Sequence, residues 1–377
     1  MEPGASRPRR AVSHNLPDFP WDTLAEARAL AAAHPGGIVD LSVGTPVDSV
    51  APLIQDALAA AAFEPGYPAT AGTARLRESA VGALVRRYGV TGLRESSVLP
   101  VIGTKEFIAW IPTLLGLNGD DTVVVPELAY PTYEVGARMA GAQVLRSDSL
   151  TQIGPHRPAV LFLNSPANPT GRVLGVDHLR KVVEWARERG VVVISDECYI
   201  GLGWDAEPTS VLHPSVCDGD HTGLIAVHSL SKSSSLAGYR AGFVAGDAGL
   251  IAELLAVRKH LGMIMPTPVQ AAMVAALDDD GHEREQRYRY ARRRAALLTA
   301  VRSAGFEVDH SEAGLYLWST RGEPCRQTLT WLAGLGILVA PGEFYGPTGG
   351  RHVRIALTGT DERIGEAVAR LEAAHTR

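Results

Sequence analysis

The chain has few cysteines and no long apolar run. Its three cysteines are Cys198, Cys217 and Cys325, in a sequence of 377 residues. An odd number of cysteines without metal-ligand spacing argues against a disulfide framework and against a metal site, so we expect a reducing, cytoplasmic compartment. No stretch of about twenty apolar residues is present, and no membrane span is expected.

An excess of basic residues is also missing. The formal net charge of −5 argues against a nucleic-acid partner. One basic cluster, at residues 282–305, is interpreted as a solvated helix face. No Gly-x-Gly-x-x-Gly motif follows a predicted strand, which argues against a nicotinamide-dependent dehydrogenase. The first dozen residues lack an apolar signal core, so residues 1–14 are expected to form a disordered tail.

Hydrophobic residues make up 46% of the chain, enough for one large and one smaller domain. Strand-like runs alternate with helix-like segments, which indicates an α/β fold with a mostly parallel central sheet and helices on both faces. The strand-like runs are 97–102, 122–125, 159–164, 191–195 and 223–228, and the helix-like segments include 75–88, 130–140 and 175–189. We expect a large domain at 45–265. Residues 15–44 and 266–377 should form a smaller α+β domain, with one long connecting helix from Ala271 onward.

A lysine among small hydroxyl residues is the most informative local feature. Lys232 follows the apolar run 223–228, where the chain leaves a parallel sheet and α/β proteins build their sites. A lysine there can form a Schiff base with an aldehyde. Arg240 offers a planar fork for an oxyanion such as phosphate, and Ser229 and Ser231 add hydroxyl donors. The combination suggests pyridoxal 5'-phosphate, although an ordinary solvated loop is the alternative.

Two further strands end in polar groups that suit the same cofactor. The run 191–195 leads into Asp196, and a carboxylate at the end of a buried strand needs a cationic partner such as a protonated ring nitrogen. Tyr199 would donate a hydrogen bond to the phenolic oxygen of the ring. Asn168, in the turn after the run 159–164, would reach the same oxygen, unless its turn is only structural.

These motifs, taken in order, resemble those of the class I/II aminotransferases, which are fold-type I pyridoxal-phosphate enzymes. The resemblance runs from near Asp18 almost to the C-terminus. It implies that Gly103, Thr104 and Lys105, at a predicted strand-to-helix turn, bind the cofactor phosphate. It also implies that Tyr130 stacks on the pyridine ring.

Three more positions follow from the resemblance. Arg354 would grip the α-carboxylate of the substrate, with a structural salt bridge as the alternative. The backbone of Gly44 would approach the same carboxylate, which the absence of a Cβ allows. Tyr67 would reach the cofactor phosphate of the neighbouring subunit, so the resemblance implies a homodimer with shared sites.

The implied reaction is a ping-pong amino transfer between an amino acid and a 2-oxo acid. The whole-length pattern is most similar to actinobacterial succinyldiaminopimelate aminotransferases of lysine and diaminopimelate biosynthesis. These interconvert N-succinyl-2-amino-6-oxopimelate plus glutamate with N-succinyl-L,L-2,6-diaminopimelate plus 2-oxoglutarate. Three alternatives stay open: an aminotransferase for aspartate or aromatic amino acids, a carbon–sulfur lyase, and a non-catalytic regulator.

Overall fold

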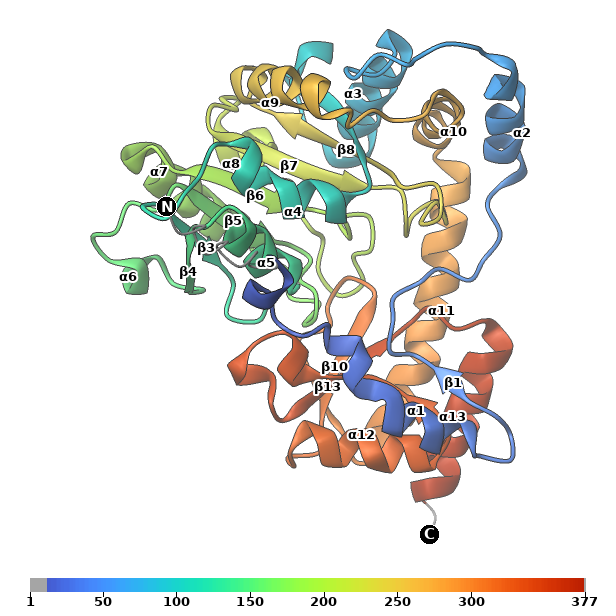
Figure 1. The fold of residues 1–377 in the computed structure, drawn as a ribbon. Coiled ribbons are helices and arrows are strands. Elements are labelled where there is room, and N and C mark those ends of the chain that lie inside the picture. Colours follow the sequence, from blue (N-terminus) through green and yellow to red (C-terminus); the bar gives the residue numbers. More distant parts are fainter. Residues whose placement is uncertain (1–11, 376–377) are drawn as a thin grey trace, which may run out of the picture.

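A seven-stranded sheet forms the centre of the larger part of the molecule. The computed structural model describes residues 12–375 (Figure 1). The strand order is β2-β8-β7-β6-β5-β3-β4. Only β8 runs opposite to its neighbours in this sheet, which confirms the predicted, mostly parallel α/β architecture. The strands are β2 Val98–Ile102, β3 Thr122–Val125, β4 Gln143–Arg146, β5 Val160–Asn164, β6 Val192–Asp196, β7 Leu224–Ser229 and β8 Ala241–Gly246.

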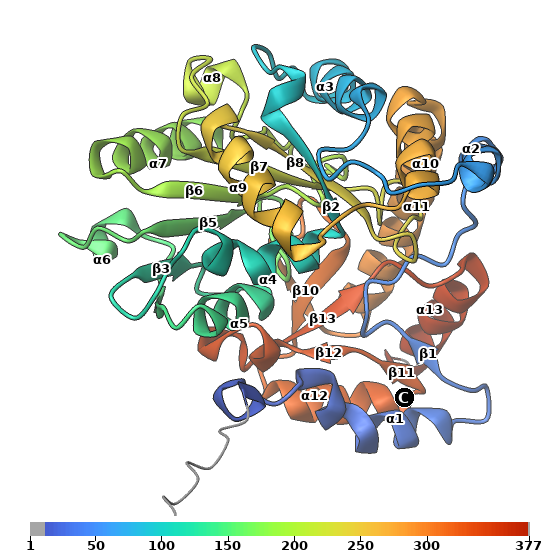
Figure 2. The same cartoon turned by 45° about the horizontal axis from the view of Figure 1, so that its top comes forward.

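Helices cover both faces of this sheet because alternate strand residues point to opposite sides (Figure 2). Along β5, Leu161 and Leu163 pack toward one face, whereas Val160 and Phe162 pack toward the other. The first face is covered by α2 Pro52–Ala60, α3 Ala74–Tyr88, α7 Val176–Arg189, α8 Pro214–Cys217 and α10 Thr267–Asp278, with α6 Leu150–Ile153 at its margin. The second is covered by α4 Thr104–Leu114, α5 Thr132–Met139 and α9 Ala248–Leu261.

Local sequence signals explain where these helices begin and end. At the start of α3, the Thr73 hydroxyl accepts a hydrogen bond from the Leu76 amide at 3.1 Å, which satisfies one of the free N–H groups. The same helix stops at Gly89, which has a φ of +65° that a residue without Cβ adopts freely.

The smaller part contains an antiparallel sheet of four strands, ordered β12-β13-β10-β9, and a two-stranded parallel pair, β1-β11. Its strands are β1 Val39–Asp40, β9 Glu307–Asp309, β10 Tyr316–Thr320, β11 Ile337–Leu338, β12 Ala340–Pro341 and β13 His352–Ala356. Its helices are α1 Ala25–Ala32, α11 Gly281–Ser303, α12 Cys325–Gly334 and α13 Asp361–His375. They share one hydrophobic core with the sheet.

The connection between the two parts differs from the sequence prediction. The prediction of a single long helix from Ala271 onward is wrong, because α10 ends at Asp278 and α11 begins at Gly281. α10 packs on α2 and α3, whereas α11 runs from there down to the small sheet (Figure 1). The domain boundaries themselves stay a prediction.

Two expectations concern the chain termini and membranes. Of the predicted tail, residues 1–11 lie outside the described residues, and Val12–Asn15 form a short 3-10 helix. Within residues 12–375, none of the helices combines the length and apolar character needed to cross a bilayer.

Candidate active site

A cavity of about 460 Å³ lies where the carboxyl ends of β5, β6 and β7 face the small sheet. Polar side chains at the ends of parallel strands meet at one edge of a sheet, so the predicted residues come together there. The predicted residues that line the cavity are Gly44, Thr104, Lys105, Tyr130, Asn168, Asp196, Tyr199, Ser229, Ser231, Lys232, Arg240 and Arg354. Gly103 and Tyr67 do not line it.

Lys232 projects into this cavity from the turn after β7. Its Nζ donates a hydrogen bond to the backbone oxygen of Gly44, which comes from the segment after β1. Burial lowers the pKa of the Lys232 amine to about 8. A sizeable fraction of the amine is therefore neutral near that pH, as a nucleophile or a proton acceptor requires.

Asp196 ends β6 and is almost completely buried. Its Oδ2 accepts a hydrogen bond from the Tyr133 hydroxyl at 2.7 Å, and its Oδ1 accepts one from the Cys198 amide at 3.2 Å. Burial raises the pKa of this carboxyl. Among residues 12–375 no cationic side chain forms an ion pair with this carboxyl, so the site fits a protonated ring nitrogen. The sequence interpretation missed Tyr133, which lies in the first turn of α5, three residues after the predicted Tyr130.

One end of the cavity has the donors that a phosphate needs. Gly103 precedes α4 with a φ of +78°, and a Cβ at this position would lie 2.1 Å from Nη2 of Arg240. The Arg240 guanidinium therefore lies directly against the start of α4. The Ser229 hydroxyl stands nearby and accepts a hydrogen bond from the Ser231 amide at 3.1 Å. A helix N-terminus, a guanidinium and two hydroxyls together fit a phosphate group.

Arg354 lies at the opposite end, on β13, with 2% of its surface exposed. Its guanidinium donates to Oδ1 of Asn168 at 2.9 Å and to the backbone oxygen of Ser42 at 2.7 Å. Its Nε has no hydrogen-bond partner among residues 12–375. The Tyr316 ring lies 3.9 Å from the guanidinium carbon. No carboxylate is among these neighbours, so this buried cation is suited to an anionic ligand.

Tyr316 contacts both Tyr199 and Gly44. The sequence interpretation assigned Tyr316 no role. The two tyrosine hydroxyls lie 3.0 Å apart, and burial raises the pKa of Tyr199, so its phenol stays protonated and can donate. A Cβ on Gly44 would come within 2.3 Å of the Tyr316 hydroxyl, which explains why glycine stands there.

The mouth of the cavity is aromatic and basic. Nζ of Lys105 lies 5.9 Å from the centre of the Tyr130 ring and 5.7 Å from that of Phe19. Trp21 and Arg28 also line the cavity, and Arg28 forms an ion pair with Asp40 at 2.9 Å.

Tyr67 lies away from the cavity, and its side chain is fully exposed. A contact with a neighbouring subunit would require such exposure in the single chain. The predicted reach to the partner's cofactor stays a prediction.

The comparison with known proteins decides the family. A family model described as aminotransferase class I and II matches residues 37–371. The chain belongs to this family. It is therefore a transaminase of the fold-type I group, and pyridoxal phosphate is its cofactor. The roles of individual residues stay predictions, although the cavity described above has the groups they require.

Three similar proteins illustrate the range of the family. A probable aminotransferase of Mycobacterium tuberculosis is 77% identical over 98% of this chain and 88% of its own length. The 4-dedimethylamino-4-oxo-anhydrotetracycline transaminase of Streptomyces rimosus is 58% identical over 94% of this chain and 99% of its own. The structure of a probable N-succinyldiaminopimelate aminotransferase from Thermus thermophilus has a TM-score of 0.84 and 28% identity, and covers 94% of this chain and all of its own.

Proposed function

We propose that this aminotransferase exchanges an amino group between glutamate and N-succinyl-2-amino-6-oxopimelate, giving 2-oxoglutarate and N-succinyl-L,L-2,6-diaminopimelate. The observation that carries the proposal is the distribution of cations in the cavity. Arg354 lies deep, where an α-carboxylate would bind, and Arg28 lines the mouth. The succinylated acceptor has carboxylates at both ends, which suits two separated cationic regions. The similarity to the Thermus thermophilus protein supports the same substrate.

Each residue has a specific role in the proposed reaction. When bound, pyridoxal phosphate supplies the electron-accepting ring and carries the amino group between the two half-reactions. Lys232 removes the proton from the substrate Cα and returns it in the reverse direction. Asp196 keeps the proton on the ring nitrogen, and Tyr199 and Asn168 hydrogen-bond the phenolic oxygen. Arg354 and the backbone of Gly44 hold the substrate carboxylate.

The remaining roles concern cofactor binding. Tyr130 stacks on the ring, and the phosphate is bound by Gly103, Thr104, Lys105, Ser229, Ser231 and Arg240. Tyr67 of a second copy completes this site, so the working enzyme is a homodimer. The proposed place of the reaction is lysine and diaminopimelate biosynthesis in the cytoplasm.

A second candidate acceptor is a large polycyclic ketone. It is favoured by the 58% identity to the Streptomyces rimosus transaminase and by aromatic side chains at the mouth. The Phe19 and Trp21 rings lie 5.5 Å apart there and offer an apolar surface.

A substrate panel with one pair of variants tests the choice. Glutamate is kept as donor, and kcat/KM is compared for the succinylated oxo acid, 2-oxoglutarate, oxaloacetate, phenylpyruvate and a polycyclic ketone. Arg28→Ala should lower kcat/KM for the succinylated acid about tenfold, since one charged contact is lost, and should leave the glutamate half-reaction unchanged. Arg75→Ala is the matched control, because Arg75 has a similar exposed ion pair, with Asp278, away from the cavity. Faster turnover of the polycyclic ketone, or no effect of Arg28→Ala, would contradict the proposed acceptor.

A further inference from the structure

Three polar side chains are linked by hydrogen bonds next to the lysine turn, the segment of residues 230–236 that carries Lys232. Nδ1 of His282 lies 2.7 Å from Oδ2 of Asp279, and Nε2 of the same ring lies 2.8 Å from the hydroxyl of Ser234. The backbone amide of His282 also donates to Oδ2 of Asp279 at 2.8 Å. Ser234 stands two residues after Lys232. These hydrogen bonds therefore connect the start of α11 to the lysine turn.

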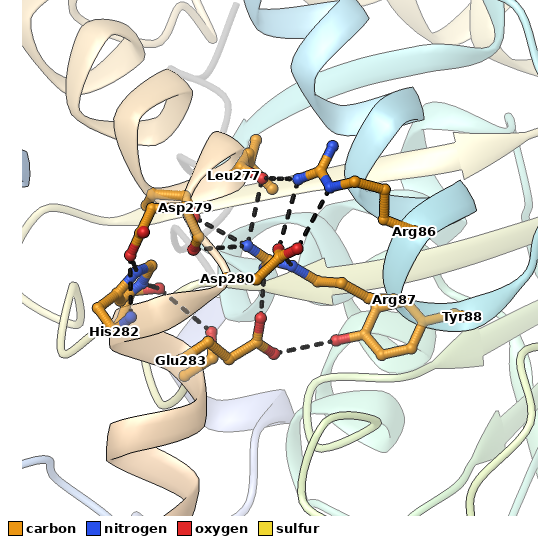
Figure 3. Close-up of polar contacts among 11 residues, drawn as sticks. Arg86, Arg87, Tyr88, Leu277, Asp279, Asp280, His282 and Glu283 are labelled. Carbon is orange, nitrogen blue, oxygen red and sulfur yellow. Dashed lines mark hydrogen bonds and ion pairs between the residues drawn. The ribbon is translucent and has the colours of Figure 1, made fainter.

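The start of α11 is itself tightly held by α3. Arg87 forms ion pairs with Asp280 at 2.7 Å and with Glu283 at 2.6 Å, and only 9% of its side chain is exposed (Figure 3). It also donates to the backbone oxygens of Ala276 and Leu277. Charge-assisted hydrogen bonds are stronger than neutral ones, and several of them converge on this one buried guanidinium. The backbone from which the His282 side chain extends is therefore held in place by Arg87.

The lysine turn, in contrast, includes an unfavourable backbone conformation. Ser235 has a φ of +57°, in the left-handed region that residues with a Cβ rarely adopt. The amides of Ser234 and Leu236 both donate to the backbone oxygen of Leu230, at 3.2 Å each. Such a turn persists only where its surroundings hold it. The contact from His282 to Ser234 is a side-chain anchor from outside the turn.

The same three residue types activate a nucleophilic serine in hydrolases. Ser234, however, is only 3% exposed, so its hydroxyl is not accessible to a substrate. A role in placing the turn agrees better with this burial. We propose that His282, oriented by Asp279, is a positioning residue that holds Ser234 and thereby fixes the turn that presents Lys232. The effect on catalysis rests on the proposed role of Lys232, whereas the effect on the turn does not.

The test measures hydrogen exchange of backbone amides in residues 230–236 of the full-length protein, with and without pyridoxal phosphate, and the kinetics of the glutamate half-reaction. His282→Ala should accelerate exchange in this segment about tenfold, the effect of one lost hydrogen bond. The maximal rate of the half-reaction should fall at least about tenfold, because the Lys232 amine is misplaced. The apparent affinity for glutamate should stay within about twofold of the wild type, because Arg354 still binds the substrate carboxylate.

Three further variants make the test specific. Ser234→Ala should reproduce the effect, and the double variant should add nothing to it, because both changes break one contact. His282→Gln should restore slow exchange, since its amide reaches the position of Nε2, whereas His282→Asn should not. Arg86→Ala is the control, because it removes an ion pair with Asp280 and leaves the His282 contacts in place.

Four results would overturn the proposal. They are unchanged exchange in His282→Ala, additive effects of the two single changes, equal behaviour of the Gln and Asn variants, and faster exchange with an unaltered glutamate half-reaction. Covalent labelling of Ser234 by a fluorophosphonate would replace the positioning role by a nucleophilic one. If instead Lys232→Ala keeps normal turnover, the proposed function fails while the exchange results still decide the role of His282.

Discussion

Glu197 allows a quantitative prediction from a buried pair of ionisable groups. It follows Asp196 and is 2% exposed. Its Oε1 accepts hydrogen bonds from the Val211 amide at 2.8 Å and the Ser195 hydroxyl at 2.9 Å. Its Oε2 lies 3.5 Å from Nε2 of His228. Burial raises the pKa of Glu197 to about 7 and lowers the pKa of His228 to about 3, so both groups are neutral between these values.

The perturbation is Glu197→Gln, which keeps the shape and removes the titration. A carboxyl with a pKa of 4.5 in the unfolded chain and about 7 in the folded chain stabilises the fold fully below pH 4.5. This stabilisation is lost as pH rises through 7. At 1.36 kcal/mol per pKa unit, the loss is about 3 kcal/mol. The free energy of unfolding of the wild type, relative to the Gln variant, should therefore fall by about that amount between pH 4.5 and pH 8.

The assay is urea denaturation of both proteins across this pH range, at one protein concentration because the apparent stability of any oligomer depends on its concentration. Taking the difference between the two proteins at each pH cancels the titration of all other groups. A difference that stays constant across the range would refute the assignment of a raised pKa to Glu197. So would a difference that grows in favour of the wild type with increasing pH, since that result requires a stabilised carboxylate.

Three further predictions concern the site directly. Gly103→Ala should weaken cofactor binding at least about tenfold, measured by titrating the cofactor-free protein, because the new Cβ lies 2.1 Å from Nη2 of Arg240 at a φ of +78°; unchanged affinity would contradict the phosphate site. Arg354→Gln should raise the KM for glutamate about 10- to 100-fold, the value of charged hydrogen bonds to a carboxylate, and a KM within threefold of wild type would count against it. Tyr67→Phe should weaken cofactor binding about tenfold, because a hydroxyl contact with the phosphate is lost. It should leave the Tm of the cofactor-free protein unchanged, because the side chain is fully exposed in the single chain; equal cofactor affinity would exclude its reach to the partner's site.

The sequence predicted the strands that carry continuous apolar runs. β2, β3, β5, β6 and β7 agree with the expected runs to within a residue at either end, because strands buried on both faces are apolar throughout. β8 was not predicted, since Ala241–Gly246 contains two glycines and two alanines and lacks that signature. β4, Gln143–Arg146, lies at the sheet edge and is only partly buried, so its sequence is mixed.

The break between α10 and α11 depends on tertiary contacts. A local contact marks the start of α11, because Oδ2 of Asp279 accepts a hydrogen bond from the His282 amide at 2.8 Å. The break is further stabilised by Arg87, almost two hundred residues earlier in the chain, which donates to Asp280 and to the backbone oxygen of Asp279. Local propensity carries no information about such a contact.

The site residues were predictable where each follows a strand. Asp196 is the last residue of β6, Lys232 and Asn168 stand in the turns after β7 and β5, and strand order brings the three together. Their supporting contacts were not predictable. The hydroxyl of Tyr133 donates a hydrogen bond to Asp196, which is 63 residues away in the sequence. The Arg354 guanidinium donates one to the backbone oxygen of Ser42, which is 312 residues away. These contacts depend on how helix, sheet and small domain pack, which spacing in the sequence does not specify.

Absorption spectroscopy of the cofactor-loaded protein tests the role of Lys232 most directly. The wild type should show a band near about 400–430 nm that glutamate converts to one at about 330 nm, and a 2-oxo acid should restore the first band. Lys232→Ala should retain some bound cofactor but should not pass through this cycle at a measurable rate, because the group that moves the proton at Cα is absent. A Lys232→Ala protein that cycles at a near-normal rate would contradict the assignment of Lys232 as the residue that performs the transfer.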